Sequence, residues 1–241
     1  MNPADVAGEI DRARRMYDAY EAKGCYDTAW APFDEVEAAY RSRQALAMAT
    51  LMRKAGLRDL SGLRILDVGC GRGRQLRSFI DMGADASSLD GIDIHEPSIS
   101  VARSLSPQLT FATFNGWEIP YPDKSFSLVT QHVVFSSIAL VELRERLAAE
   151  MVRVLRPGGY VFWWDTLRLS RFADGEQAPL DVGRLFSELP TEQLRIGQQP
   201  TLAECLRVPH TGRRLARFVL KRIRLFDYPT THLAALIGPK R

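Results

Sequence analysis

The strongest constraint on the fold is an alternation of short apolar runs and amphipathic segments between Leu63 and Asp165. The runs have strand length, and the segments repeat their apolar residues at helical spacing. The expected strands are LRILDV, LDGIDI, LTFATF, FSLVTQHVV and YVFWWD, and the expected helices are RQLRSFIDMG, PSISVARSL and VELRERLAAEMVRVLRPGG, the last of which should end at Pro157 and Gly158. Such an alternation predicts a parallel sheet with helices on both faces.

The regions on either side of this alternation are expected to add helices and two further strands. Helical periodicity covers Met1 to about Tyr20 and Phe33 to about Lys54, so residues 1–60 are interpreted as a helical cap or lid and residues 61–241 as the main domain. In the second helix, a shared apolar face is expected for Ala38, Ala45, Met48, Leu51 and Met52. After Asp165 we expect a short helix in DVGRLFSELP, a broken strand in LRIGQQPTLAECL, a basic helix in TGRRLARFVLKRIRLF and a last strand in HLAALIG.

A glycine-rich turn directly follows the first expected strand. The spacing is D-x-G-x-G-x-G from Asp67 to Gly73, and Arg74 stands where the dinucleotide fingerprint G-x-G-x-x-G requires its third glycine. Asp93, at the end of the next strand, suits the two hydroxyls of a ribose, which S-adenosylmethionine and NAD both contain. The turn therefore predicts a nucleotide-like ligand, and Arg74 disfavours NAD.

Four stretches in order resemble the class I S-adenosylmethionine-dependent methyltransferases. ILDVGCGRG resembles the family's first motif, GIDIHEPSISVAR its second, NGWEIPYPDKSFSLVTQHVVF the adenine segment with the fourth strand, and VLRPGGYVF the approach to the fifth. The resemblance implies an α/β, Rossmann-like fold with a mostly parallel seven-stranded sheet, helices on both faces and an N-terminal helical extension. It also implies S-adenosyl-L-methionine as cofactor and S-adenosyl-L-homocysteine as product.

The resemblance further implies where the cofactor binds. The loop from Asp67 to Gly73 would lie under the methionine portion and the ribose, Asp93 would hold the ribose diol, and Ile94 would pack on the adenine. Asn115 stands where the family often has an acid, and Arg41 or Arg43 would meet the methionine carboxylate. The expected cofactor residues are Asp67, Gly69, Cys70, Gly71, Gly73, Asp93, Ile94, Asn115, Gly116, Trp117, Gln131, His132 and Arg43.

His132, after the fourth strand, is the candidate general base, because imidazole titrates near neutrality. The alternative, that it only hydrogen-bonds cofactor or substrate, stays open. For His232 a structural hydrogen bond is favoured over catalysis, and His95 and His210 have no metal-site spacing.

Aromatic residues of the N-terminal extension form a candidate lid that excludes water, with core packing as the alternative. They are Tyr17, Tyr20, Tyr26 and Trp30.

Resemblance to the family also makes residues 167–209 a candidate acceptor-binding insertion. In it, Arg168 and Arg171 either bind an anionic group or belong to a solvated loop.

Composition limits the partners. The net charge of +3 is too small to argue for nucleic acid or a membrane surface, and no apolar run has the length of a membrane span. Three scattered cysteines predict neither a disulfide framework nor a zinc cluster, and the N-terminus lacks a signal-peptide pattern, so a cytoplasmic protein without a bound metal is expected.

The expected function is methyl transfer to an oxygen or nitrogen of a small molecule, such as a secondary metabolite or a saccharide intermediate. A nucleic-acid acceptor is disfavoured because QHVV occupies the place of the aromatic-plus-proline tetrapeptide used for base amines. The alternatives are a non-catalytic domain that binds S-adenosylmethionine to regulate a partner, and an NAD-dependent oxidoreductase.

Overall fold

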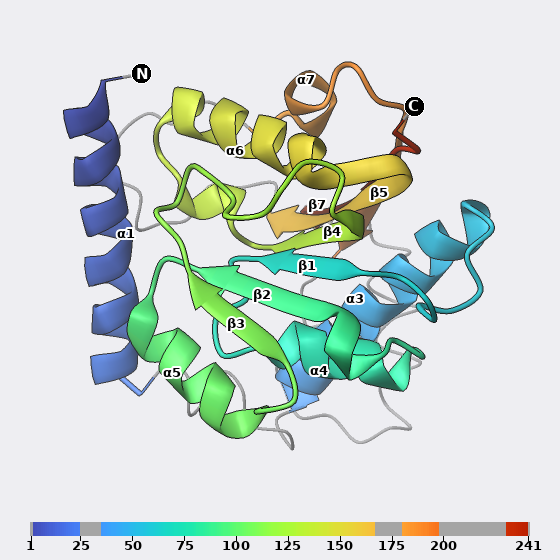
Figure 1. Cartoon of the computed structure of the whole chain (residues 1–241), viewed down its shortest axis with the longest axis horizontal. Helices are drawn as coiled ribbons and strands as arrows, with labels where there is room; N and C mark the ends of the chain where they lie inside the picture. Colours follow the sequence, from blue (N-terminus) through green and yellow to red (C-terminus); the bar gives the residue numbers. More distant parts are fainter. Residues whose placement is uncertain (1, 25–34, 167–179, 198–229, 241) are drawn as a thin grey trace, which may run out of the picture.

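The computed structural model describes residues 2–24, 35–166, 180–197 and 230–240. Its centre is a seven-stranded sheet in the order β3-β2-β1-β4-β5-β7-β6 (Figure 1). The strands are β1 (Ile65–Val68), β2 (Leu89–Asp93), β3 (Thr110–Thr113), β4 (Phe126–His132), β5 (Leu155–Thr166), β6 (Thr191–Gly197) and β7 (Thr230–Ile237). Neighbours among β1 to β5 pair in parallel, whereas β7 is antiparallel to both β5 and β6. The expected Rossmann-like, mostly parallel fold is confirmed.

Helices cover both faces of the sheet (Figure 1). The helices are α1 (Pro3–Ala22), α3 (Glu35–Lys54), α4 (Arg74–Asp81), α5 (Glu96–Leu105), α6 (Val141–Val154) and the short α7 (Val182–Leu185). Residues of α3, α4 and α5 share one apolar cluster with one face of the sheet, and residues of α6 and α7 share a second cluster with the other face. The first helix, α1, lies across the ends of the strands instead (Figure 1).

The expected end of helix α6 was wrong. Helix α6 ends at Val154, before Pro157, because Leu155 already pairs with Phe126 of β4. The amino group of Lys240 donates hydrogen bonds to the carbonyls of Val152 and Leu155, so the end of this helix is closed by the C-terminal segment.

The buried face of α3 also differs from the expected one. Ala38 and Ala45 are exposed, and the buried stripe consists of Gln44, Ala47, Met48, Leu51 and Met52. A polar residue, Gln44, thus belongs to the apolar side of this helix. The expected basic helix lies outside the described residues.

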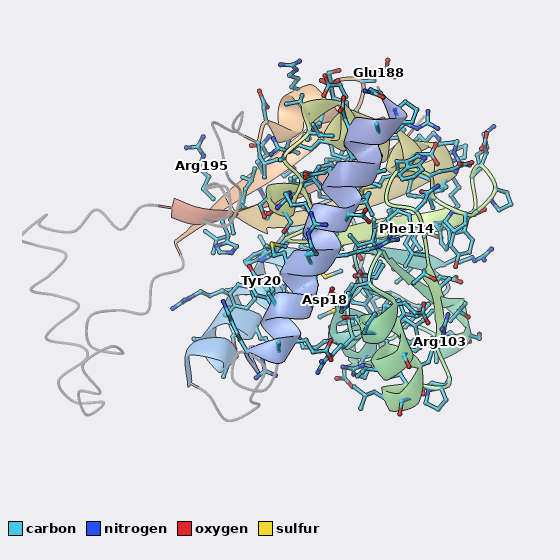
Figure 2. All side chains as sticks on the ribbon, turned by 90° about the vertical axis from the view of Figure 1, so that its left-hand side faces the viewer. Asp18, Tyr20, Arg103, Phe114, Glu188 and Arg195 are labelled. Atoms are coloured by element: carbon cyan, nitrogen blue, oxygen red, sulfur yellow. The ribbon has the colours of Figure 1, made fainter. Side chains whose placement is uncertain are left out.

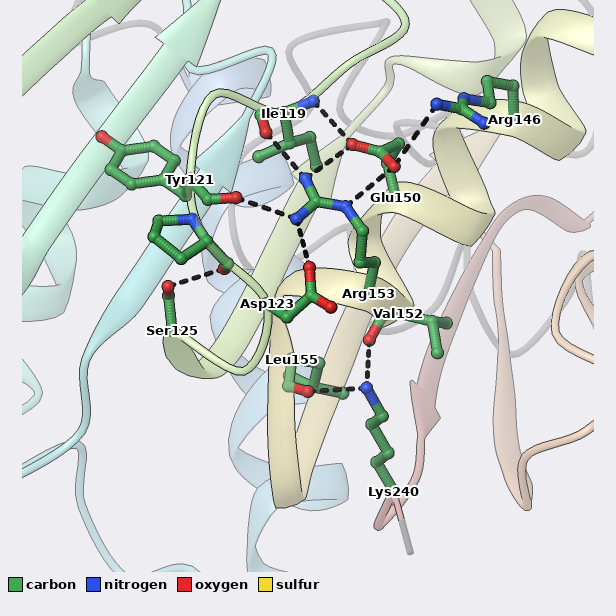
Figure 3. A network of polar contacts seen from close by, with 11 residues as sticks. Ile119, Tyr121, Asp123, Ser125, Arg146, Glu150, Val152, Arg153, Leu155 and Lys240 are labelled. Carbon is green, nitrogen blue, oxygen red and sulfur yellow. Dashed lines mark hydrogen bonds and ion pairs between the residues drawn. The ribbon is translucent and has the colours of Figure 1, made fainter.

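A polar network fastens the segment between β3 and β4 to α6 (Figure 3). The guanidinium of Arg153 donates to the carbonyls of Ile119 and Tyr121 and pairs with the carboxylates of Glu150 and Asp123. Glu150 in turn accepts a hydrogen bond from the backbone N–H of Ile119. These contacts satisfy the backbone polar groups of a segment that has no strand partner of its own.

Replacing Arg153 with alanine should lower the free energy of unfolding by about 2–3 kcal/mol, because the buried carboxylate of Glu150 and two carbonyls lose a charged donor. Urea unfolding followed by circular dichroism measures the effect. The control is Arg156→Ala, at an exposed position. Equal losses in both variants would contradict a stabilising role for this network.

Candidate active site

A largely apolar cavity, partly open to solvent, lies where β1, β2 and β4 end. The sheet side contributes Gly69, Asp93 and Gly116, and α1 contributes Ile10 and Tyr17. Figure 2 looks onto this edge and shows α1 lying across it, with Asp18 and Tyr20 on its lower half. The carboxyl edge of a parallel sheet is the usual ligand site of such folds, and an apolar lining with a few polar groups is typical of ligand pockets.

The three glycines of the turn have different structural reasons. All have positive φ angles, which favour glycine. A Cβ on Gly69 would lie 2.3 Å from Cγ2 of Val134, and one on Gly73 would lie 2.6 Å from Cζ of Phe111, so packing within the protein requires both glycines. A Cβ on Gly71 would meet nothing within 4 Å. The space beside Gly71 is open for a ligand to approach the backbone.

The carboxylate of Asp93 is held by the backbone of two loops. Its Oδ2 accepts a hydrogen bond from the N–H of Gly71 at 2.8 Å, and its Oδ1 accepts one from the N–H of His95 at 2.9 Å. Burial raises the pKa of Asp93, and these hydrogen bonds partly oppose the rise. Each oxygen keeps a lone pair for a ligand hydroxyl.

A second buried carboxylate, Asp67, lies at the end of β1. Only 2% of its surface is exposed, and it accepts a hydrogen bond from the Thr130 hydroxyl at 2.7 Å. Burial raises its pKa to about 7, the Thr130 hydrogen bond opposes the rise, and the charge of Asp93 adds to it. Within the described segments, no lysine or arginine forms an ion pair with Asp67 or Asp93. The negative charge of these two carboxylates favours a positively charged ligand group beside them.

The segment after β3 reaches the cavity beneath α1. Asn115 closes a turn, since its Oδ1 accepts hydrogen bonds from the N–H groups of Trp117 and Glu118. Gly116 has a φ of 97°, and a Cβ there would lie 2.3 Å from Cδ1 of Ile10. Trp117 packs in the small cluster that α1 forms with the sheet edge, as does the cavity residue Ile94.

Two expected cofactor residues direct their side chains elsewhere. Cys70 is buried with its Sγ against β2, where a Cβ on Gly91 would lie 2.9 Å from it. The amide of Gln131 is buried, donates to the carbonyl of Trp164 and accepts from the N–H of Val134. Both side chains therefore support the backbone around the cavity.

His132 ends β4 and contacts a residue of α3. Its Nδ1 lies 2.6 Å from Nε2 of Gln44, its ring lies 5.7 Å from that of Phe162, and its Nε2 is buried with no hydrogen-bond partner in the described part of the chain. Burial lowers the pKa of His132 to about 3, and the charge of Arg74 adds to the effect. The next residue, Val133, has a φ of 60°, which is strained for a β-branched residue.

Other residues singled out in the sequence lie around this region. His232 packs against the rings of Tyr40 and Trp164, and burial lowers its pKa to about 4. Arg43 is a half-buried neighbour of Gln44 on α3. Tyr26, Trp30, Arg168, Arg171 and His210 lie outside the described residues.

Helix α1 is fastened over the cavity by polar contacts that no sequence pattern revealed. Three acids of this helix each reach a different loop: Glu9 accepts from the N–H of Ala139, Asp18 contacts Nε2 of His95, and Glu21 pairs with Arg72. Arg14 also donates to the carbonyl of Ile94. Of the expected lid residues, Tyr17 lines the cavity, and the ring of Tyr20 packs edge-on against the ring of Tyr17.

Neither a metal centre nor a membrane span is found in the part of the chain that the structure describes. No three residues of the types that bind metals come together there, and none of its helices combines the length and the apolar character needed to cross a bilayer.

Comparison with known proteins identifies the domain at the centre of the chain. Residues 66–163 match the family model described as "Methyltransferase domain". These residues carry a methyltransferase domain, and the chain has the fold of S-adenosylmethionine-dependent methyltransferases. It is similar to the crystal structure of a TehB-like SAM-dependent methyltransferase from Corynebacterium glutamicum, with a TM-score of 0.56 and 18% identity, over 94% of this chain and 100% of that one.

Two curated relatives align with about half of this chain. Phthiotriol/phenolphthiotriol dimycocerosates methyltransferase 1 of Mycobacterium ulcerans is 33% identical over 49% of this chain and 43% of the relative. The fatty-acid O-methyltransferase of Mycolicibacterium smegmatis is 30% identical over 52% of this chain and 44% of the relative. The chain thus spans less than half the length of these relatives.

The raised pKa of Asp67 makes stability depend on pH. With a folded pKa of about 7 against an ordinary 3.8, the folded chain holds this proton between these values, so the free energy of unfolding falls as pH rises from about 4 to 7. The full shift corresponds to about 4 kcal/mol. Asp67→Asn should flatten this decline in urea unfolding of the ligand-free protein, whereas Asp81→Asn, at an exposed position, should not. An unchanged slope in Asp67→Asn would refute the assignment.

The carboxylate of Glu9 should hold α1 in place. In Glu9→Ala the N–H of Ala139 loses its acceptor and Arg12 keeps the carbonyl of Ser137 but loses the carboxylate, so backbone amides of α1 should exchange with deuterium roughly tenfold faster, equivalent to about 1.4 kcal/mol. Hydrogen-exchange mass spectrometry measures this rate. Arg15→Ala, on the exposed side of the helix, is the control and should exchange like the parent.

Proposed function

We propose that this chain is an S-adenosylmethionine-dependent methyltransferase that transfers the methyl group to an oxygen or nitrogen of a small molecule. The observation that carries the proposal is the pair of buried carboxylates, Asp67 and Asp93, on either side of an open glycine turn. In S-adenosylmethionine the methyl group is bonded to a positively charged sulfonium sulfur. When the methyl group is transferred, this sulfur becomes a neutral thioether. A site with two buried acids suits the positive charges of a sulfonium and an ammonium group.

The chain's own residues then have distinct roles. Asp93 would bind the ribose hydroxyls with the oxygens that Gly71 and His95 orient, and the charge of Asp67 would favour the ammonium group of the methionine portion. Ile94 and the turn at Gly116 form the apolar adenine surface, which α1 covers with Ile10. The helix that covers the cavity excludes water. Holding the cofactor and the acceptor in the right orientation can lower the activation barrier by roughly 7–11 kcal/mol.

The two alternatives are less well supported. A dinucleotide would bring its diphosphate toward Asp67 and Asp93, and Arg74 replaces the glycine that helix packing in dinucleotide sites requires. A non-catalytic role is separated from catalysis only by an assay of methyl transfer.

The nature of the acceptor is supported by the relatives. The names of both curated relatives describe methyl transfer to lipids, and one specifies oxygen. We therefore favour an acceptor with an apolar chain over a saccharide. Incubation with a panel of such acceptors, read as a one-methyl mass gain, tests transfer directly.

Binding of S-adenosylmethionine should weaken roughly 10- to 100-fold in Asp93→Asn, because the ribose hydroxyls lose a charged acceptor worth about 1.5–3 kcal/mol. Titration calorimetry measures the affinity, with Asp81→Asn as the exposed control. Binding of NAD but not S-adenosylmethionine by the parent protein would contradict the proposal.

A further inference from the structure

The contact between Gln44 and His132 joins α3 to the end of β4. Gln44 is only 5% exposed, although it stands on the apolar side of its helix, and its amide nitrogen lies 2.6 Å from Nδ1 of His132. An amide nitrogen donates hydrogen bonds and does not accept them, so Nδ1 receives the hydrogen bond. The neutral ring must then carry its proton on Nε2.

The buried Nε2 of His132 has no hydrogen-bond partner in the described part of the chain. A buried donor without an acceptor is costly, by about 1–3 kcal/mol, and a catalytic role is one explanation for such a group. The ring is neutral near pH 7, since burial and the charge of Arg74 keep its pKa at about 3. With its proton on Nε2, His132 has no lone pair there with which to act as a base.

We propose that Gln44 holds His132 as a neutral hydrogen-bond donor whose Nε2–H binds the acceptor oxygen, and that this oxygen belongs to a carboxylate. The inference rests on the proposed function and deepens it. His132 is then a residue that touches the acceptor, and Gln44 is a positioning residue that fixes the tautomer of His132.

A carboxylate acceptor needs no base. One of its oxygen lone pairs forms the bond to the methyl carbon as the carbon–sulfur bond breaks, the bonding pair stays on sulfur, and no proton has to leave. An alcohol must also lose its proton, and lack of a base costs roughly 100- to 10,000-fold in rate. Transfer to a carboxylate also cancels an anion and a sulfonium cation, and apolar surroundings such as Phe162 favour the loss of both charges.

The surroundings of His132 also suit an acid with an apolar body. The rings of Tyr40, Trp164 and His232 pack together where β5 and β7 pair, on the face of the sheet that carries His132 and Phe162. The positive charge of Arg74 acts on His132 and would offset the charge of a bound carboxylate. The aromatic rings would pack against an apolar chain, and the Nε2–H of His132 and the charge of Arg74 would favour a carboxylate. Together these groups suit a fatty acid better than an amine.

The tautomer is measured first, without any turnover. In the full-length protein labelled with ¹⁵N-histidine, long-range proton–nitrogen spectra should show the Nε2–H form of His132. In Gln44→Glu the carboxylate accepts from Nδ1–H, so the ring should change to the Nδ1–H form. Gln193→Glu, the same change at an exposed position, should leave it unaltered. An Nδ1–H tautomer in the parent protein overturns the proposal.

Acceptor class is tested by titrating the labelled protein with decanoate and with decan-1-ol in the presence of S-adenosylhomocysteine. Decanoate should shift the Nε2–H resonance of His132, and decan-1-ol should shift it far less. An equal response to both, or none to decanoate, overturns the carboxylate assignment.

Turnover gives a separate measure. The parent should methylate decanoate at least roughly 100-fold faster than decan-1-ol, and Gln44→Glu should lose at least about tenfold in kcat on decanoate, because the wrong tautomer meets the acceptor. Binding of S-adenosylmethionine by calorimetry should stay unchanged in this variant. Failure of the parent to bind S-adenosylmethionine would refute the proposed function, whereas an unchanged kcat in Gln44→Glu would refute only the role of Gln44.

Discussion

The carboxylate of Asp93 joins the two loops on which the site depends. It accepts the backbone N–H of Gly71 after β1 and that of His95 after β2. Because β1 and β2 are adjacent parallel strands, their loops meet at one edge of the sheet, and a single side chain can bridge them. The bridge holds the glycine turn in the conformation that leaves open space beside Gly71. The shape of this edge of the sheet is thus held by hydrogen bonds within the chain.

The fold could be predicted from sequence because parallel strands are buried on both faces and therefore appear as continuous apolar runs. Local sequence patterns gave wrong predictions where contacts with residues far away in the sequence determine the structure. The end of α6 is set by the pairing of Leu155 with Phe126, which no helix-stop signal records. The face of α3 was misjudged because alanines such as Ala45 are tolerated on either side of a helix.

The site was only partly accessible to sequence reasoning. The turn from Asp67 to Gly73 and Asp93 stand together as the spacing implied. Gln131 and His132 were both expected at the cofactor, but successive residues of a strand point to opposite faces, and the Gln131 amide is used within the protein. Gln44 was missed because one glutamine in a helix carries no motif. Its only signal was its register with Met48 and Leu51 on the buried stripe.

The position of α1 has a thermodynamic consequence. The helix supplies one wall of the cavity and is fastened, through Glu9, Asp18 and Glu21, to three loops that contribute to the other walls. A ligand inside touches helix and loops together, so its binding and the docking of the helix are linked. By reciprocity, the free energy with which the helix favours a bound ligand equals the free energy with which that ligand favours the docked helix. The affinity for the cofactor and the stability of the docked helix α1 therefore measure the same coupling free energy.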